Sequence, residues 1–373
     1  MKQKTLVLLP LISLMLTSCG TIRKYDNHLT DYIFERNFHE KYNILQLSDI
    51  HWSGNTSTIN SEKYLSKVLL ETDRHIKEEI DASGKIDLVE ITGDMFMLSN
   101  AYHVKTFIDF FEKKAKEYGF EYAVIWGNHD RHGVYNPNWL GGQFTKAKHC
   151  IYYEPDDDLY GRSNFVINLN NDNNTETIWQ IANLDSGASF SETVVSIFRD
   201  YDYIRKDQTD WWLKENILAG NPSTIAYYHI PQDENLKAWN NRNLYKNKYF
   251  KLEDFADNGN QKYESNFIDE GRRLGTLKAA FMGHAHNVDW TVDYDGVVIG
   301  LGVKTGQELY FAHIDVNDQN PEVQEGLISV GINENFDLIG ASLVTIKDNN
   351  NFDLEHLYLN ERTNEDFIRW VKW

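Results

Sequence analysis

Apolar runs of strand length alternate with amphipathic helical stretches through the first third of the chain. Strand-like runs lie at 41–51, 85–94 and 122–127, and the stretches 60–80 and 101–118 repeat their apolar residues with a helical period. A strand–helix–strand–helix–strand order is typical of βαβ units, whose strands lie parallel in one sheet. This part of the chain therefore predicts an α/β fold with a parallel sheet at its core.

The pattern changes in the rest of the chain. A short helix is predicted at 207–217, and further strand-like runs lie at 162–169, 177–186, 223–231 and, after a helix end, 275–286. The last runs alternate like an antiparallel sheet, at 289–302, 327–333, 340–347 and 352–359. Residues 232–262 are polar and lack a sustained period, so we expect a long loop or a cap insertion there. With neither an internal repeat nor a clear linker, one domain is predicted over 41–373.

The first twenty residues have the pattern of a targeting segment. Two lysines precede an apolar run that is too short to span a bilayer comfortably, and the run ends in the letters LTSC at Cys19. These letters resemble a bacterial lipobox, in which the cysteine is lipidated. We therefore expect a signal peptide at 1–18 and a lipid-anchored tether at 19–40, with an uncleaved anchor helix as the alternative. The protein would then be extracytoplasmic and membrane-anchored, at the bacterial cell surface or in the periplasm.

Composition narrows the classes of function. Hydrophobic residues make up 41% of the chain, which is enough for a sizeable core. The net charge of −19 disfavours nucleic acid as a partner, because phosphate backbones select basic surfaces. Cys19 and Cys150 are the only cysteines, so lipidation of Cys19 leaves no intramolecular disulfide and no thiolate metal site. Any metal must be held by His, Asp, Asn or Glu.

Five strand-like runs each end in residues suited to binding metal ions. In chain order these residues are Asp49 and His51, then Asp94, then Asn128, His129 and Asp130, then His229, and finally His284 and His286. In open α/β sheets, ligands gather beyond the carboxyl ends of the strands, so we expect the five ends to meet at one site. Alone, a Gly-Asp pair is more often a turn and a single histidine more often structural. All five motifs in this order favour a metal site.

The order D-x-H, G-D, G-N-H-D, lone His and G-H-x-H resembles the calcineurin-like metallophosphoesterase superfamily over about residues 43–305. Within it, the chain looks most similar to the Dcr2-like relatives of purple acid phosphatases. The resemblance implies a four-layer α/β/β/α sandwich of two mixed sheets with a dinuclear metal centre. The first metal would be held by Asp49, His51, Asp94 and His286. Asp94 would bridge to the second metal, which would be completed by Asn128, His229 and His284.

The same resemblance implies the remaining chemistry. Carboxylate, imidazole and amide ligands suit Mn, Fe or Zn without selecting one of them. Met97 stands where purple acid phosphatases proper have a tyrosine, which argues against an iron–tyrosinate centre. His129 would stabilise the transition state or protonate the leaving oxygen, and Asp130 would orient its imidazole or cap a helix. Arg131 would contact a phosphate, or else form a surface salt bridge.

The favoured hypothesis is a lipid-anchored phosphohydrolase that cleaves a phosphorylated small molecule with a metal-activated hydroxide. Monoesters and diesters are both open as substrates. The alternative is a surface metal-containing binding lipoprotein without turnover, in which 232–262 contributes an interaction surface. A substrate-facing His129 disfavours that alternative, and the acidic charge disfavours a nuclease.

Overall fold

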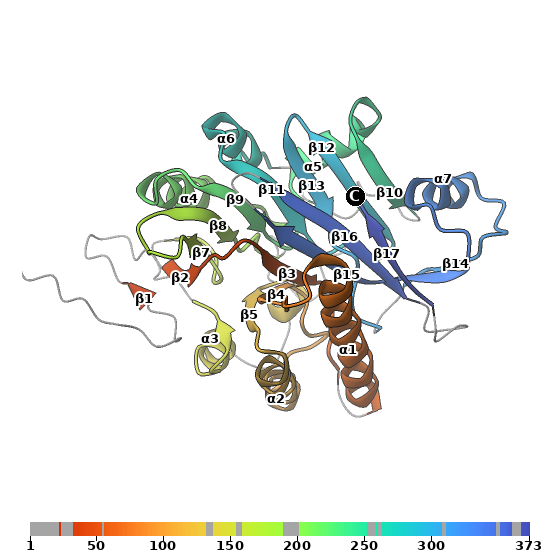
Figure 1. Cartoon of the computed structure of the whole chain (residues 1–373), viewed down its shortest axis with the longest axis horizontal. Coiled ribbons are helices and arrows are strands. Elements are labelled where there is room, and N and C mark those ends of the chain that lie inside the picture. The colour runs from red at the N-terminus through yellow and green to blue at the C-terminus, as the bar shows by residue number, and fades with distance from the viewer. Residues whose placement is uncertain are drawn as a thin grey trace, which may run out of the picture.

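Two β-sheets lie face to face, and helices cover the outer face of each sheet (Figure 1). The computed structural model describes the chain except at residues 1–21, 24–32, 54–55, 132–136, 154–158, 189–200, 252–258, 260–262, 308–310, 348–350 and 360–366. The expected signal peptide and Cys19 lie outside the described residues. Among the residues that are described, no helix is both long and apolar enough to cross a bilayer. The predicted four-layer sandwich of two mixed sheets is confirmed.

The first sheet has the strand order β17-β16-β15-β3-β4-β5-β6, with β14 paired to β15. Its parallel strands are β3 (Tyr42–Leu47), β4 (Leu88–Thr92), β5 (Glu121–Ile125) and β6 (Cys150–Ile151). Its antiparallel strands are β14 (His313–Ile314), β15 (Phe336–Ile346), β16 (Phe352–Leu359) and β17 (Ile368–Lys372). The outer face is covered by α1 (Thr56–His75), with its π-helical end Ile76–Ile80, by α2 (Ala101–Tyr118) and by α3 (Pro137–Phe144).

The second sheet has the strand order β1-β2-β7-β8-β9-β11-β13-β12-β10. These strands are β1 (Ile22–Arg23), β2 (Ile33–Asn37), β7 (Phe165–Asn170), β8 (Thr177–Asn183), β9 (Ser223–Tyr227), β10 (Asn247–Lys251), β11 (Leu277–Met282), β12 (Val288–Tyr294) and β13 (Val297–Leu301). Its outer face is covered by α4 (Lys206–Leu218), α5 (Asp233–Asn240) and α6 (Phe267–Leu274). In Figure 1, α4 and α6 lie above the sheets and α1, α2 and α3 below them.

Alternation along the strands divides the core into layers. On β3, Leu45 and Leu47 belong to the cluster under α1 and α2, whereas Ile44 faces the other sheet. On β9, Ala226 packs under the outer helices, whereas Ile225 and Tyr227, on either side of it, face the other sheet. Because both faces of the central strands are buried, these strands read as nearly continuous apolar runs in the sequence.

The strand predicted at 327–333 is wrong. Leu327 and Val330 lie in α7 (Pro321–Val330), where Val323, Leu327 and Val330 form one buried helical face. The helix has ordinary termini: the Asn320 side chain caps its first turn, and Gly331 ends it with a φ of 71°.

The loop predicted at 232–262 is also partly wrong, because α5 and β10 lie within it, and β10 pairs antiparallel with β12. The helical period of α5 is hidden because its buried side chains include polar ones. Among them, Glu234 accepts hydrogen bonds from the backbone N–H groups of Ile268 and Asp269 at the start of α6. Part of the predicted tether is likewise ordered in the sheet, because β2 pairs in parallel with β7.

Candidate metal centre

The five predicted motifs follow the carboxyl ends of five strands. Asp49 and His51 follow β3, Asp94 follows β4, and Asn128 follows β5 in the first sheet. His229 follows β9, and His284 and His286 follow β11 in the second sheet. All seven side chains are buried, with exposed fractions of 9% or less. The packing of the two sheets therefore brings together residues that lie up to 237 positions apart in the sequence.

The seven side chains form two groups that share a border. The first group consists of Asp49, His51 and His286, and the second of Asp94, His229 and His284; within each group the possible ligand atoms lie within 4.8 Å of one another. The Asn128 Oδ1 atom lies 3.1 Å from His229 Nε2, so Asn128 joins the second group. Asp94 faces both groups, with Oδ1 3.3 Å from His229 Nε2 and Oδ2 3.8 Å from His51 Nε2.

Four of these residues adopt a backbone conformation that is uncommon outside glycine. The φ angles are 53° at Asp49, 51° at His51, 49° at Asp94 and 80° at His284. Such residues cluster at functional sites, where the surrounding structure holds them in place. The chain therefore leaves each of these strands by a sharp turn that aims the side chain at the centre.

The glycines of the motifs are required by close approach. A Cβ atom on Gly127 would lie 2.2 Å from Asp94 Oδ1, and one on Gly283 would lie 2.1 Å from the Ser48 hydroxyl oxygen. Real Cβ atoms essentially never come this near to another atom. The glycine before each ligand cluster therefore makes room for a neighbouring motif.

Hydrogen bonds lock the motifs to one another. The backbone N–H of His284 donates to Asp49 Oδ2 over 2.9 Å, and the backbone N–H of His129 donates to Asp94 Oδ1 over 2.8 Å. Lys304, which is buried, donates to the backbone carbonyl of Asp49 over 2.8 Å. The sequence reading missed Lys304, although a lysine just after the apolar strand β13, between Gly302 and Gly306, was a visible signal.

The charges within the centre prepare the side chains as ligands. Burial would raise the pKa of Asp94, but the neighbouring His229 holds it well below its usual value. Burial would lower the pKa of His229, but Asp94 raises it to about 9. Burial would raise the pKa of Asp49, but the neighbouring His286 and His229 together outweigh this effect, so the pKa falls. Burial lowers the pKa of His284 to about 3 and also lowers that of His51. The ionised carboxylates and the neutral imidazoles of His51 and His284 are in the form that binds metal, whereas His229 must first lose a proton.

The donor atoms fit a metal ion. Among the described residues, the fully buried Asp49 Oδ1 has no hydrogen-bond partner, and it lies 3.8 Å from His51 Nε2 and 3.5 Å from His286 Nε2. The Nε2 atoms of His51 and His286 lie 3.1 Å apart. A cation between these atoms would satisfy the carboxylate oxygen that is otherwise desolvated. Mixed oxygen and imidazole donors suit Zn, Mn or Fe.

The three other predicted residues lie beside the ligands. The ring of His129 is half-buried, and its centre lies 5.1 Å from that of His51 in an edge-to-face contact. Asp130 accepts hydrogen bonds from the backbone N–H groups of Phe96 (3.0 Å) and Gly127 (2.8 Å), and burial and the nearby Asp94 raise its pKa to about 8. These bonds tie two loops of the centre together.

The half-buried Arg131 forms an ion pair with a buried carboxylate. Its guanidinium donates to both carboxylate oxygens of Asp185, which is fully buried. The carboxylate of Asp185 also accepts from the backbone N–H of Gly187 over 2.9 Å. The structure thus places the predicted phosphate-binding residue in a pair that fixes the loop behind His129.

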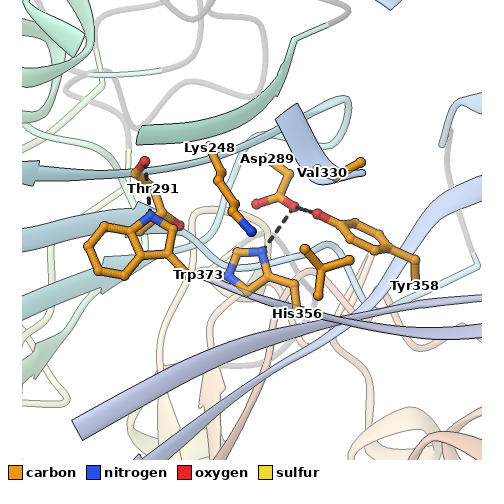
Figure 2. A pocket seen from close by; sticks show the side chains of 8 residues that line it. Lys248, Asp289, Thr291, Val330, His356, Tyr358 and Trp373 are labelled. Carbon is orange, nitrogen blue, oxygen red and sulfur yellow. Dashed lines mark hydrogen bonds and ion pairs between the residues drawn. The ribbon is translucent and has the colours of Figure 1, made fainter. Parts of the chain in front are cut away.

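A separate small pocket lies between the sheets, away from the seven ligands. Figure 2 shows Lys248, Asp289, Thr291, His356, Tyr358 and Trp373 around it. Asp289 accepts hydrogen bonds from His356 Nδ1, over 3.0 Å, and from the Tyr358 hydroxyl group. Both donors lie on β16 and Asp289 on β12, so this carboxylate joins the two sheets.

Comparison with known proteins identifies a family that matches most of the chain. The family model described as calcineurin-like phosphoesterase matches residues 42–288. The chain is 24% identical over 302 residues to a probable inactive purple acid phosphatase 28 of Arabidopsis thaliana, covering 72% of this chain and 71% of that protein. It is 24% identical over 213 residues to phosphatase DCR2 of Saccharomyces cerevisiae, covering 52% of this chain and 36% of that protein. A solved dimetal phosphatase from Danio rerio is 12% identical with a TM-score of 0.48, covering 89% of this chain and 99% of that one.

Proposed function

The chain belongs to the calcineurin-like phosphoesterase family, and from this membership and the geometry of the centre we propose that it is a dinuclear metal-dependent phosphohydrolase. The observation that carries the proposal is the convergence of seven metal-ligand side chains, from five strand ends, in two adjoining buried groups. The substrate would be a small molecule that carries a phosphoester, either a monoester or a diester.

The ligand groups define where two ions would be held. Asp49, His51 and His286 would hold one ion, and Asn128, His229 and His284 the other, with Asp94 between them. Mn, Fe or Zn ions held by these residues would supply a water of lowered pKa and would neutralise charge on the phosphoryl oxygens. The described carboxylates of the centre are deeply buried, so their field is weakly screened by solvent.

His129 is the residue that we expect to act on the substrate directly. Its half-buried ring lies beside His51 at the border of the first group, and its backbone is bonded to Asp94. From this position the imidazole would donate a proton to the leaving oxygen, or a hydrogen bond to a phosphoryl oxygen. Asp130 holds the loop that carries His129 through its bonds to Phe96 and Gly127.

A second candidate function is metal-dependent binding without turnover. It is favoured by one relative, the Arabidopsis protein, whose name describes it as probably inactive. In this chain, all seven ligand positions and His129 carry residues that can perform their roles, which favours turnover.

We also propose that lipid on Cys19 anchors the protein to the bacterial membrane, outside the cytoplasm. The support is the lipobox-like sequence alone. Metabolic labelling with palmitate, compared between the full chain and its Cys19→Ser variant, tests it: label in both or in neither contradicts the proposal.

The enzymatic proposal is tested by hydrolysis assays on protein that begins at residue 20. p-Nitrophenyl phosphate and bis-p-nitrophenyl phosphate are offered with Mn²⁺ either added or removed by a chelator. Turnover that requires the metal supports a phosphohydrolase, and the preferred ester identifies the substrate class. Two bound ions per chain with no turnover of a broad panel of phosphoesters would favour the binding protein.

A further inference from the structure

Three of the seven ligands keep a small contact with solvent. Asp49, His51 and His229 have exposed fractions of 0%, whereas His286 reaches 6%, Asn128 7% and His284 9%. His284 has an aromatic neighbour: the half-buried ring of Tyr201, whose centre lies 4.4 Å from that of His284 at an angle of 83°. The half-buried Tyr201 therefore lies beside the most exposed of the seven ligands.

Tyr201 begins a segment whose side chains alternate between two sides. Asp202 and Ile204 are buried, whereas Tyr201, Tyr203 and Arg205 are half-buried. In an extended chain, alternate residues share a face, and two positions span about 7 Å. The alternating burial therefore places Tyr203 on the same half-buried face as Tyr201, two residues further along the chain.

Four planar groups stack at this position, and we call them the planar wall: Tyr160, Arg205, Tyr203 and Tyr263. The rings of Tyr203 and Tyr263 are nearly parallel, with centres 5.1 Å apart and planes inclined by 12°. The Arg205 guanidinium lies 3.7 Å from the centre of the Tyr160 ring and 5.6 Å from that of Tyr203. All four groups are half-buried, so each keeps some surface open to solvent.

A single buried carboxylate holds three of the four members of the planar wall in place. Asp202 accepts hydrogen bonds from the Tyr160 hydroxyl group, from the Arg205 guanidinium (3.3 Å) and from the backbone N–H of Tyr203 (2.9 Å). A Cβ atom on Gly187 would lie 2.5 Å from Asp202 Cβ, which shows how tightly the loop encloses this carboxylate. The wall is therefore preorganised, and binding a ligand does not require its rings to be ordered first.

We propose that Tyr201 and the planar wall bind the leaving-group side of the substrate, and that they select phosphoesters whose leaving group carries a planar ring, such as an aryl group or a nucleobase. This inference rests on the proposed function, because it assigns the phosphoryl group to the ions. Planar rings stack on tyrosine faces and on guanidinium groups. Tyr203 of the wall shares its half-buried face with Tyr201, which contacts the metal ligand His284.

The test compares two non-hydrolysable ligands of similar size, phenylphosphonate and cyclohexylphosphonate, by calorimetric titration of the Mn²⁺-loaded protein. Planarity is the main difference between their rings. We expect phenylphosphonate to bind about fivefold more tightly, since aromatic pairs gain affinity beyond their buried area. The ratio of the two affinities should persist in Tyr203→Phe, and it should fall to near one in Tyr203→Leu. Tyr245→Leu, which removes a half-buried ring that contacts Tyr294 and no member of the planar wall, serves as the matched control and should keep the preference.

Equal affinities for the two phosphonates in the unmodified protein overturn the inference, as does binding of neither one. A preference that survives in Tyr203→Leu also overturns it, and the unmodified protein decides the matter even if that variant fails to fold. Turnover of phenyl phosphate separates the two proposals: a planar preference without turnover supports this inference and contradicts the phosphohydrolase. Turnover of phenyl phosphate without a preference for the planar ligand supports the phosphohydrolase and contradicts this inference.

Discussion

The Nδ1 atom of His229 lies 2.8 Å from the backbone carbonyl oxygen of Thr92. Since a carbonyl oxygen only accepts hydrogen bonds, Nδ1 carries a proton and Nε2 is left to face Asp94 (3.3 Å) and Asn128 (3.1 Å). This bond selects the tautomer of His229 that binds a metal through Nε2, and it fixes the plane of the ring.

The first prediction concerns pH. Asp94 raises the pKa of His229 to about 9 against the effect of burial, so this imidazole must lose a proton when it binds metal. The other ligands with shifted pKa values are already in their binding forms at pH 7. We expect the apparent Mn²⁺ affinity to rise roughly tenfold per pH unit from pH 7 to about 9 and then level off. Calorimetric titrations at several pH values measure the slope, and a flat profile contradicts the assignment.

The same shift affects the stability of the metal-free protein. A histidine whose pKa is raised on folding stabilises the folded state fully below its ordinary pKa of about 6.5, and this contribution is lost as the pH rises through about 9. The difference in melting temperature between Mn²⁺-loaded and chelated protein should therefore increase from pH 6.5 to 9. A constant difference would argue against a charged His229 in the metal-free state.

The second prediction concerns Asp94, which faces both groups. Asp94→Asn removes the charge that lies between the two ion positions and keeps the size of the side chain. Replacing a residue that only supports a metal ligand costs up to roughly 100-fold in activity. We expect turnover of Asp94→Asn to fall by more than this, together with loss of bound metal. Metal analysis and hydrolysis assays measure both. Asp295→Asn is the matched control, because Asp295 has a similar φ of 51° and lies in the exposed β12–β13 turn. Full activity in Asp94→Asn would contradict the proposed centre.

The third prediction separates His129 from the metal ligands. His129→Gln keeps a polar side chain but cannot transfer a proton. We expect kcat to fall by about 100-fold or more while both ions remain bound. A loss that is smaller for aryl esters than for alkyl esters would identify protonation of the leaving oxygen, because an aryloxide leaves readily without a proton. Loss of metal from this variant would instead make His129 a ligand.

The fourth prediction uses two glycines. A methyl group at Gly127 would lie 2.2 Å from Asp94 Oδ1, so Gly127→Ala should displace that carboxylate and lower metal content and turnover together. Gly142 lies inside α3 with nothing within 4 Å of its added Cβ, so Gly142→Ala should raise stability by roughly 0.5–1 kcal/mol. Thermal denaturation and metal analysis of both variants test the pair, and a fully active Gly127→Ala would show that the loop can shift.

The fifth prediction concerns the pocket in Figure 2. Tyr358→Phe removes a hydrogen bond to the buried Asp289 carboxylate without changing the ring. We expect a loss of about 1.5–3 kcal/mol in unfolding free energy, as for hydrogen bonds to charged groups. Bound metal should not change, because neither residue is among the seven ligands. Urea denaturation measures the effect, and an unchanged midpoint would mean that water replaces the hydroxyl group.

Much of the fold could be predicted from the sequence, because its signals are local. The helix predicted at 101–118 coincides with α2, and the apolar runs that became β3, β4 and β5 end where their ligands begin. The helix α7 was missed because a short apolar stretch was read without its Asn-Pro start and its glycine end. The helix α5 was missed because Glu234 is buried as a cap for α6, which breaks the apolar period.

The candidate site divides in the same way. The motifs identify residues that follow strands, so the positions of the seven ligands were expected from the sequence. The residues that contact these ligands and loops from other segments were not expected, because such contacts join parts of the chain that are far apart in the sequence. Arg131 pairs with Asp185, 54 residues away, and Tyr201, between β8 and α4, meets His284, which follows β11. Nothing local in the sequence distinguishes these partners from other arginines and tyrosines.

Each metal group draws on both sheets, since His286 joins Asp49 and His51, and Asp94 joins His229 and His284. An ion in either position is therefore a crosslink between the two halves of the sandwich. Neither half contains a complete coordination sphere, so an ion can be captured firmly only after the halves have met during folding, and it is released when they part. Occupancy of the centre thus reports whether the sandwich is closed, and a metal-loaded chain should separate its sheets far more slowly than an empty one.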